Sequence, residues 1–393
     1  MLQSIRRRVI GIVACAVLTM LFGSVSAAGA ATDYMLIDAA RLASLPTSTA
    51  QYAYMKKTAD DAMASVSLSS ATSNSPWLTN YGGKSAETLA AALVYARTGD
   101  TRYRDFVIAV NRFIIGSEES ASTNGTAGDD KLLATMRQIS GYVLAADLVN
   151  MGPNTTGSRS RYGSTTWRTW VARLRTKSIG DGNCDSIVHC NLKATNWGAW
   201  ASAARTVIDV HIGDSVDRKI AVNRLKLYLG ETMSGTPWIR STRFDSSWAC
   251  IPRGLPVSFV PVNGSSCGRG KDGILVEDAS RSSYSYPSFD DKGIDYTFHA
   301  YGAQLIAALV LDRQGYDVWG WGDNALKRIM DRLDRLGAAT GNDRAGASHV
   351  SWIPRHFYGV SYPTVPAQAG NTLGYTDWLY GAAAAPPPPP PLG

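Results

Sequence analysis

The sequence lacks several features that would assign it to common classes of protein. Beyond one apolar run near its N-terminus it has no stretch of membrane length, and it has no basic run interleaved with aromatic residues. A membrane-spanning mature protein and a nucleic-acid-binding protein are therefore not expected. Strand-like alternation of apolar and polar residues occurs only in short pieces, which argues against a β-rich fold.

The N-terminal residues have the pattern of an export signal. Arg6–Arg8 precede an apolar run from Val9 to Val25, and Ala28–Ala30 supply small residues for cleavage. We predict a signal peptide at 1–30 and a secreted protein, extracellular or periplasmic. Cleavage removes three arginines and no acids, which lowers the net charge from +7 to +4, with 36 basic against 32 acidic residues. This balance favours polyanionic partners only mildly.

Four cysteines remain in the mature chain, in two close pairs. An even number in an exported protein favours disulfides between Cys184 and Cys190 and between Cys250 and Cys267. A zinc site is the alternative, but neither pair has the CxxC spacing of such sites. We expect no metal and no cofactor.

Apolar periodicity predicts a mainly α-helical domain at 31–381, followed by an Ala/Pro-rich tail or linker at 382–393. The segment 234–290 is expected to be mostly irregular, a length that suggests a functional segment. Paired helices can stack so that each pair buries its apolar face against the next. We therefore predict an all-α fold, an α/α toroid or incomplete barrel of helical hairpins with long irregular loops. The expected helices are Tyr52–Ala64, two helices around the turn Thr98–Asp100, Leu132–Val149, Trp167–Leu174, Ala199–Ile212, Val216–Leu229, Gln304–Arg313 and Asn324–Leu336.

The stretch Asp272–Leu309 combines polar residues with an apolar helix and is the best candidate for a site. Asp295 is a suitable N-cap, and Leu305 and Leu309 follow on one buried helix face. Tyr296 and His299 are three residues apart, so both can point the same way. The alternative is that the two rings close a core against a loop.

Three motifs in chain order carry a resemblance to a known family. The first is ALVYARTGDTRYRDFVIAV, the second is TNWGAW at Thr195–Trp200, and the third runs from Asp272 through HAYGAQLIAALVLDRQGYDVWGWGDNALKRIMDRL. Together they resemble the alginate lyase superfamily of polysaccharide lyases over most of Ser85–Leu336. The resemblance implies an α/α toroid that cleaves a uronic-acid-containing polysaccharide, alginate or glucuronan-like, by β-elimination. We expect a monomer whose partner is this anionic polysaccharide.

The resemblance also implies roles for individual residues. Asn196 matches the family asparagine that faces the substrate carboxylate, and Arg281 matches an arginine that can bind an acidic sugar. His299 matches the histidine of a Tyr-His pair. The chain departs from the family pattern at Trp197, which stands where a histidine is common, and at Phe298, which stands in place of the catalytic tyrosine.

Because phenylalanine cannot transfer a proton, the catalytic role must pass to Tyr296 or Tyr301. We choose Tyr296 as the base because it shares a helix face with His299, whereas Tyr301 points elsewhere in a regular helix. The expected substrate-binding residues are Trp197, Trp200, Tyr301, Glu277 and Arg355, although tryptophans at this spacing also occur in cores.

Two other classes of function remain open. An α/α-toroid glycoside hydrolase would need a pair of carboxylates, and five acidic residues are available in this region: Glu277, Asp278, Asp290, Asp291 and Asp295. A non-catalytic polysaccharide-binding protein would tolerate the two departures from the family pattern.

Overall fold

The computed structural model describes residues 33–66, 68, 84–119, 128–179, 184–231, 272–275, 278, 291–340, 350–363 and 373–381. The chain divides into two compact units, Met1–Asp33 and Tyr34–Gly393, and the second unit contains all of these residues except Asp33. The predicted signal peptide, the Pro-rich tail, Cys250 and Cys267 lie outside the described residues.

Helices make up most of the described chain, which contains no strand; an isolated β-bridge joins Thr156 and Thr166. The predicted all-α class is confirmed. No helix in this part of the chain is both long enough and apolar enough to cross a membrane. The α-helices are α2 Ala39–Ser44, α3 Ala50–Ser65, α4 Ser85–Thr98, α5 Thr101–Ile114, α6 Gly128–Leu148, α7 Trp167–Leu174, α8 Ile187–Cys190, α9 Asn196–Ile212, α10 Ser215–Tyr228, α12 Asp291–Asp312, α13 Trp321–Thr340, α14 Trp352–Tyr358 and α15 Thr376–Gly381.

Two of the helical hairpins use the same turn chemistry. Gly99 ends α4 with a φ of 75°, and Gly213 ends α9 with a φ of 71°. Glycine adopts such positive φ angles without strain. Asp100 and Asp214 follow as N-caps of α5 and α10. Each accepts a hydrogen bond from a backbone N–H in the next helix, at 3.1 and 3.0 Å. The Gly-Asp pairs therefore reverse the chain, as their sequence predicts.

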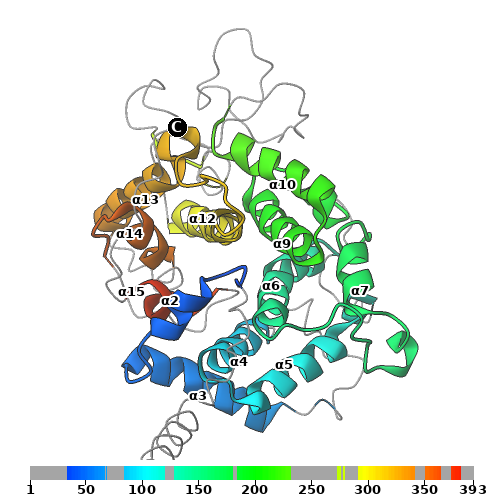
Figure 1. Cartoon of the computed structure of the whole chain (residues 1–393). Coiled ribbons are helices and arrows are strands. Elements are labelled where there is room, and N and C mark those ends of the chain that lie inside the picture. Colours follow the sequence, from blue (N-terminus) through cyan, green and yellow to red (C-terminus); the bar gives the residue numbers. More distant parts are fainter. Residues whose placement is uncertain are drawn as a thin grey trace, which may run out of the picture. The chain divides into compact units, whose positions relative to one another are not determined.

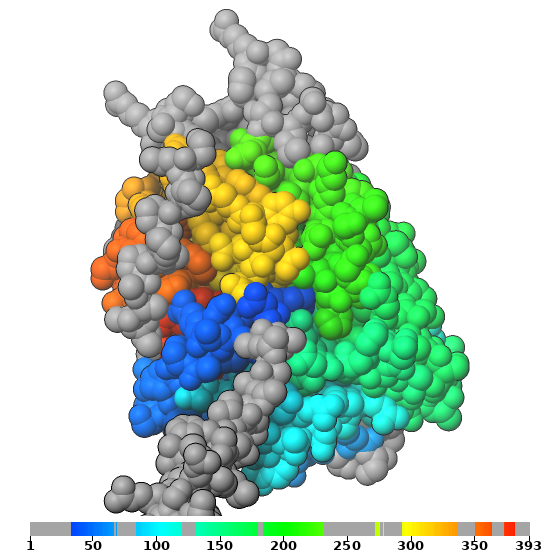
Figure 2. All heavy atoms as spheres, viewed as in Figure 1, coloured from blue at the N-terminus to red at the C-terminus, as the bar shows by residue number. Residues whose placement is uncertain are grey.

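The helices pack in an order that follows the chain (Figure 1). α3 packs on α4, α4 on α6, α6 on α9, and α9 on α12; the order continues through α13, α14 and α15, and α15 packs against α3. α5, α7 and α10 pack on α4, α9 and α9 respectively. Figure 2 shows the residues of α12 (yellow) next to those of α9 and α10 (green) on the face in view.

Among the helices that begin earlier than predicted, α9 and α12 carry candidate site residues. α9 begins at Asn196 instead of Ala199, so Asn196 and Trp197 lie in its first turn. α12 begins at Asp291, four residues before Asp295, which is therefore not its N-cap. Tyr296 and His299 accordingly lie in the second and third turns of α12.

Buried ion pairs fix α9 to its neighbours. Arg175, just after α7, contacts Asp209 of α9 and reaches Asp217 of α10 at 2.8 Å. Arg205 of α9 also bonds Asp217, and it donates to Asn191 Oδ1 at 3.2 Å in the segment that leads into α9. These contacts hold the helix and its preceding loop in one arrangement.

Candidate active site

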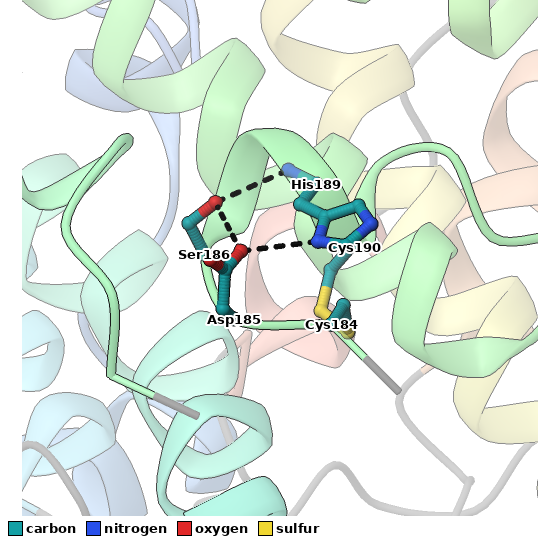
Figure 3. Close-up of a disulfide and its surroundings, with 5 residues drawn as sticks. All are labelled: Cys184, Asp185, Ser186, His189 and Cys190. Carbon is teal, nitrogen blue, oxygen red and sulfur yellow. Dashed lines mark hydrogen bonds and ion pairs between the residues drawn. A yellow bond between two sulfur atoms is a disulfide. The ribbon is translucent and has the colours of Figure 1, made fainter. Parts of the chain in front are cut away.

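The loop before α9 is closed by a disulfide. Cys184 and Cys190 are bonded, with their Cα atoms 5.2 Å apart, which confirms the first predicted pair (Figure 3). The carbonyl of Cys190 then accepts a hydrogen bond from Lys193 N at 2.8 Å. The disulfide thus lies six residues before Asn196 in a loop with its own internal bonds.

Ser186, His189 and Asp185 share this loop but do not form a nucleophilic triad. His189 Nδ1 lies 3.0 Å from Asp185 Oδ1, and the Ser186 hydroxyl bonds the same carboxylate oxygen at 3.1 Å (Figure 3). In a triad the serine hydroxyl is bonded to the imidazole. Ser186 instead caps the short helix α8, where its hydroxyl accepts from His189 N at 3.4 Å.

The glycine of the TNWGAW motif has a packing role. A Cβ atom on Gly198 would collide with the backbone carbonyl of Lys193. Only a residue without a side chain allows the disulfide loop to pack this closely on the first turn of α9. The motif glycine therefore helps to position Asn196, two residues before it.

The N-terminus of α9 is capped from a distant part of the chain. Thr195 occupies the N-cap position, but its side chain makes no capping bond. The backbone N–H of Asn196 instead donates to Asp278 Oδ1 at 3.0 Å, and the Asp278 side chain is fully buried. A carboxylate at this end of a helix interacts favourably with its dipole. Asp278 thereby joins the third sequence motif to the second.

The Asn196 side chain is fully buried, and neither its amide nitrogen nor its amide oxygen has a hydrogen-bond partner among the described residues. The side chain of Gln304 in α12 is also fully buried, and neither its amide nitrogen nor its amide oxygen has a hydrogen-bond partner among the described residues. Buried amides in folded proteins normally have partners, because an unpaired one costs free energy. The Asn196 amide is therefore a buried donor and acceptor that no described residue uses.

Arg137 of α6 links this region to α12. It is 9% exposed, and its guanidinium carbon lies 5.4 Å from the centre of the Trp200 ring, a cation–π distance. Trp200 is one turn after Asn196, on the same face of α9. The charge of Arg137 also lowers the pKa of His299, and α9 packs on both α6 and α12.

His299 is held in its neutral form. Burial lowers the pKa of His299 below its ordinary value, the positive charge of Arg137 lowers this pKa further, and Asp295 opposes both. Asp295 is one turn earlier on α12, with its Oδ2 atom 3.6 Å from His299 Nε2. Tyr296 is half-buried on the same stretch of helix. A neutral imidazole at neutral pH can accept a proton.

We give the name Asn196–His299 cluster to Asn196, Trp200, Arg137, Tyr296 and His299. Arg137 contacts Trp200 and its charge acts on His299, while Asn196 and Tyr296 lie within one turn of Trp200 and His299 on their helices. Sequence reasoning missed Arg137 and Gln304. The sequence does mark Arg137, because it is the only charged residue between Leu132 and Ala146 in a strongly apolar helix. A charge in such a helix is unusual and can indicate a functional residue.

The other candidate residues lie elsewhere or outside the described chain. Tyr301 is fully buried, and its hydroxyl donates to the Leu326 carbonyl at 2.9 Å, so it belongs to the core. Trp197 is half-buried against the core. Arg355 is exposed on α14, with its guanidinium 5.6 Å from the ring centre of Trp352. Arg281 and Glu277 lie outside the described residues.

Among the described residues, no three His, Cys, Asp or Glu side chains gather into a group that could hold a metal ion. The chain matches no protein-family model and no curated protein.

Proposed function

We propose that this chain is an exported polysaccharide lyase with an α/α-toroid fold, and that it cleaves a uronic-acid-containing polysaccharide by β-elimination. Two observations support the fold. The order of helix contacts runs from α3 to α15 and returns to α3. In addition, α4 packs on α5 and α9 packs on α10, as in the hairpins that the sequence predicts. The three motifs that resemble alginate lyases contribute to helices of this series.

The reaction places three demands on a site. The proton at C5 of the uronate is only weakly acidic, so the adjacent carboxylate must be neutralised to stabilise the enolate-like transition state. A base must remove the C5 proton, whose electron pair forms the C4–C5 double bond. The bond from C4 to the glycosidic oxygen breaks, and an acid must protonate that oxygen.

The Asn196–His299 cluster has a residue for each demand. Arg137, which is 9% exposed, supplies the positive charge that the substrate carboxylate needs. The fully buried Asn196 amide supplies a hydrogen bond to the same group once substrate binding uncovers it. Arg137 thus takes the place of the histidine that Trp197 replaces. A neutral imidazole is a ready proton acceptor, so we now assign the C5 proton to His299 and the donation to the leaving oxygen to Tyr296.

One observation carries this proposal: Arg137 lies against Trp200 and its charge acts on His299, while the amide of Asn196, one turn before Trp200, has no hydrogen-bond partner among the described residues. Three helices contribute to one polar cluster in a largely apolar interior. A fold that needed only stability would not place a guanidinium, an imidazole and an unpaired amide there.

The activity is tested by incubating the protein with polymannuronate, polyguluronate and glucuronan while ultraviolet absorbance is followed. The elimination product carries a double bond conjugated to a carboxylate and absorbs, whereas a hydrolysis product does not. We expect absorbance to rise with at least one polymer. New reducing ends without absorbance would identify a hydrolase, and binding without cleavage would identify a non-catalytic protein.

The residue assignments are tested with a matched pair of histidines. His299 and His189 each follow an aspartate by four residues and contact it, at 3.6 and 3.0 Å. We expect His299→Gln to lower kcat by about 10²- to 10⁴-fold, the usual contribution of general acid–base catalysis. His189→Gln should keep wild-type activity. Equal losses in the two variants would show that His299 is not catalytic.

Asn196→Ala and Tyr296→Phe are each expected to abolish most turnover and to leave polymer binding largely intact. Full activity in Tyr296→Phe would remove Tyr296 from the mechanism. The comparison requires Kd and kcat to be measured on the same polymer.

A further inference from the structure

A second region of the molecule carries an excess of positive charge. The sequence from 148 to 180 contains six basic residues and no acidic one. One of the six, Arg175, is neutralised by the aspartates of α9 and α10. The other five, together with Arg112 of α5, form what we call the basic surface: Arg112, Arg159, Arg161, Arg168, Arg173 and Lys177.

The loop between α6 and α7 brings these residues together. Arg112 Nε donates to the Thr156 carbonyl at 3.0 Å, and Thr156 is bridged to Thr166 at the start of α7. The backbone N–H of Arg168 donates to the Pro153 carbonyl at 3.1 Å. Figure 2 shows this part of the chain (teal green) at the surface between α5 and α10.

Only two carboxylates face these cations among the described residues. Arg173 lies 3.2 Å from Glu118, and Lys177 and Arg161 lie 2.6 and 3.1 Å from Glu119. Glu118 is buried and also accepts from the Trp170 indole at 2.8 Å. Six cations against two carboxylates leave an excess of four positive charges.

Several of the cations remain available to a ligand. The Arg161 side chain is 76% exposed, and Arg112 and Arg168 are exposed without an acidic partner in the described part of the chain. Arg159 is only half-buried and lies over the Phe113 ring at 4.3 Å. Arginine forks of this kind bind carboxylates by paired hydrogen bonds.

The neighbouring side chains favour a polysaccharide over nucleic acid or a membrane. The aromatic residues of this region, Tyr162, Trp167 and Trp170, are buried, so no ring is exposed for bases to stack on. None of the large exposed hydrophobic residues of the described chain lies here to anchor a membrane. Exposed hydroxyls at Ser158, Ser160 and other positions lie between the arginines instead.

We propose that the basic surface is a second binding site for a carboxylate-bearing polysaccharide, separate from the Asn196–His299 cluster. The start of α7 lies beside the end of α9, because Trp167 Nε1 donates to His211 Nε2 at 2.9 Å. His211 is fifteen residues after Asn196 on α9, a separation of about 22 Å along the helix axis. A long polymer can contact both places, whereas a short oligosaccharide cannot.

The test compares two triple variants in binding to sodium alginate. Arg112→Gln, Arg161→Gln and Arg168→Gln together remove three exposed charges of the basic surface. Lys57→Gln, Arg102→Gln and Lys219→Gln remove three exposed charges elsewhere. We expect the first triple variant to raise Kd by about tenfold or more and to flatten its salt dependence, and the second to change Kd by less than about twofold.

An unchanged Kd in the first triple variant, or equal losses in the two, would overturn the proposal. Tighter binding of double-stranded DNA than of alginate at matched charge would reassign the surface to nucleic acid. Uncharged dextran should not bind. Cleavage of short oligouronates is measured separately, so loss of the proposed lyase activity and loss of this surface give different results.

Discussion

Acidification should destabilise the fold through His211, near the C-terminal end of α9. His211 Nε2 accepts a hydrogen bond from the indole of the buried Trp167 at 2.9 Å, and only a neutral imidazole can do so. Burial lowers the pKa of His211 to about 4 from an ordinary value of 6.5, and the positive charge of Arg168 contributes to this lowering.

The sign and size of the effect follow from linkage. Between pH 6.5 and pH 4 the unfolded chain binds a proton at His211 that the folded chain does not, so the free energy of unfolding falls as pH falls. Stability from the neutral imidazole is fully present above pH 6.5 and is lost by pH 4. A shift of this size corresponds to about 3 kcal/mol, at about 1.4 kcal/mol per pH unit.

Urea unfolding followed by tryptophan fluorescence, over a range from about pH 7.5 to about pH 4.5, measures this loss. Buried carboxylates also contribute, so the quantity of interest is the difference between wild type and His211→Gln, whose amide oxygen can still accept from Trp167. We expect the variant to lose about 2 to 3 kcal/mol less over this range. Arg168→Gln should also reduce the loss, because removing that charge raises the pKa of His211. Parallel curves for wild type and His211→Gln would refute the reasoning.

Three further predictions concern the site and its loop. Arg137→Gln should lower kcat by about 10²- to 10³-fold. Because the charge of Arg137 lowers the pKa of His299, the variant should also move the acidic limb of the kcat/KM profile to higher pH. An unmoved limb would show that Arg137 does not influence the ionisation of His299. Gly198→Ala should destabilise the fold by at least about 1 to 3 kcal/mol, because the new Cβ meets the Lys193 carbonyl, and an unchanged Tm would contradict this packing. Reduction of the Cys184–Cys190 disulfide should lower the free energy of unfolding by about 2 kcal/mol, given its short loop, as measured by urea unfolding with and without reductant.

Local chemistry made most of the helices predictable. The turns Thr98–Asp100 and Gly213-Asp214 each contain a glycine, which can end a helix, followed by an aspartate, which can cap the next one. In the structure the glycines end α4 and α9, and the aspartates cap α5 and α10. Between these two turns, apolar periodicity predicts the ends of the long helices to within a few residues, because each helix buries one face against its neighbours.

Contacts between distant parts of the chain were not predictable in this way. The start of α9 depends on the Asp278 carboxylate, 82 residues after the Asn196 N–H that it accepts from, and no local pattern indicates such a cap. Arg137 was overlooked because it belongs to none of the three motifs. Its significance depends on Trp200 and His299, which the fold brings to it from two other helices.

The burial pattern along α12 bears on the proposed chemistry at the position where the chain departs from the family motif. Phe298, where the resemblance implies a catalytic tyrosine, is buried in the core together with Thr297, Ala300 and Tyr301. A phenol at 298 would therefore face packed side chains. Asp295, Tyr296 and His299 instead form the exposed and half-buried stripe of the same turns. Within these turns only this stripe is accessible to a substrate. In the proposed lyase, proton transfer from α12 therefore comes from Tyr296 or His299, whichever residue occupies position 298.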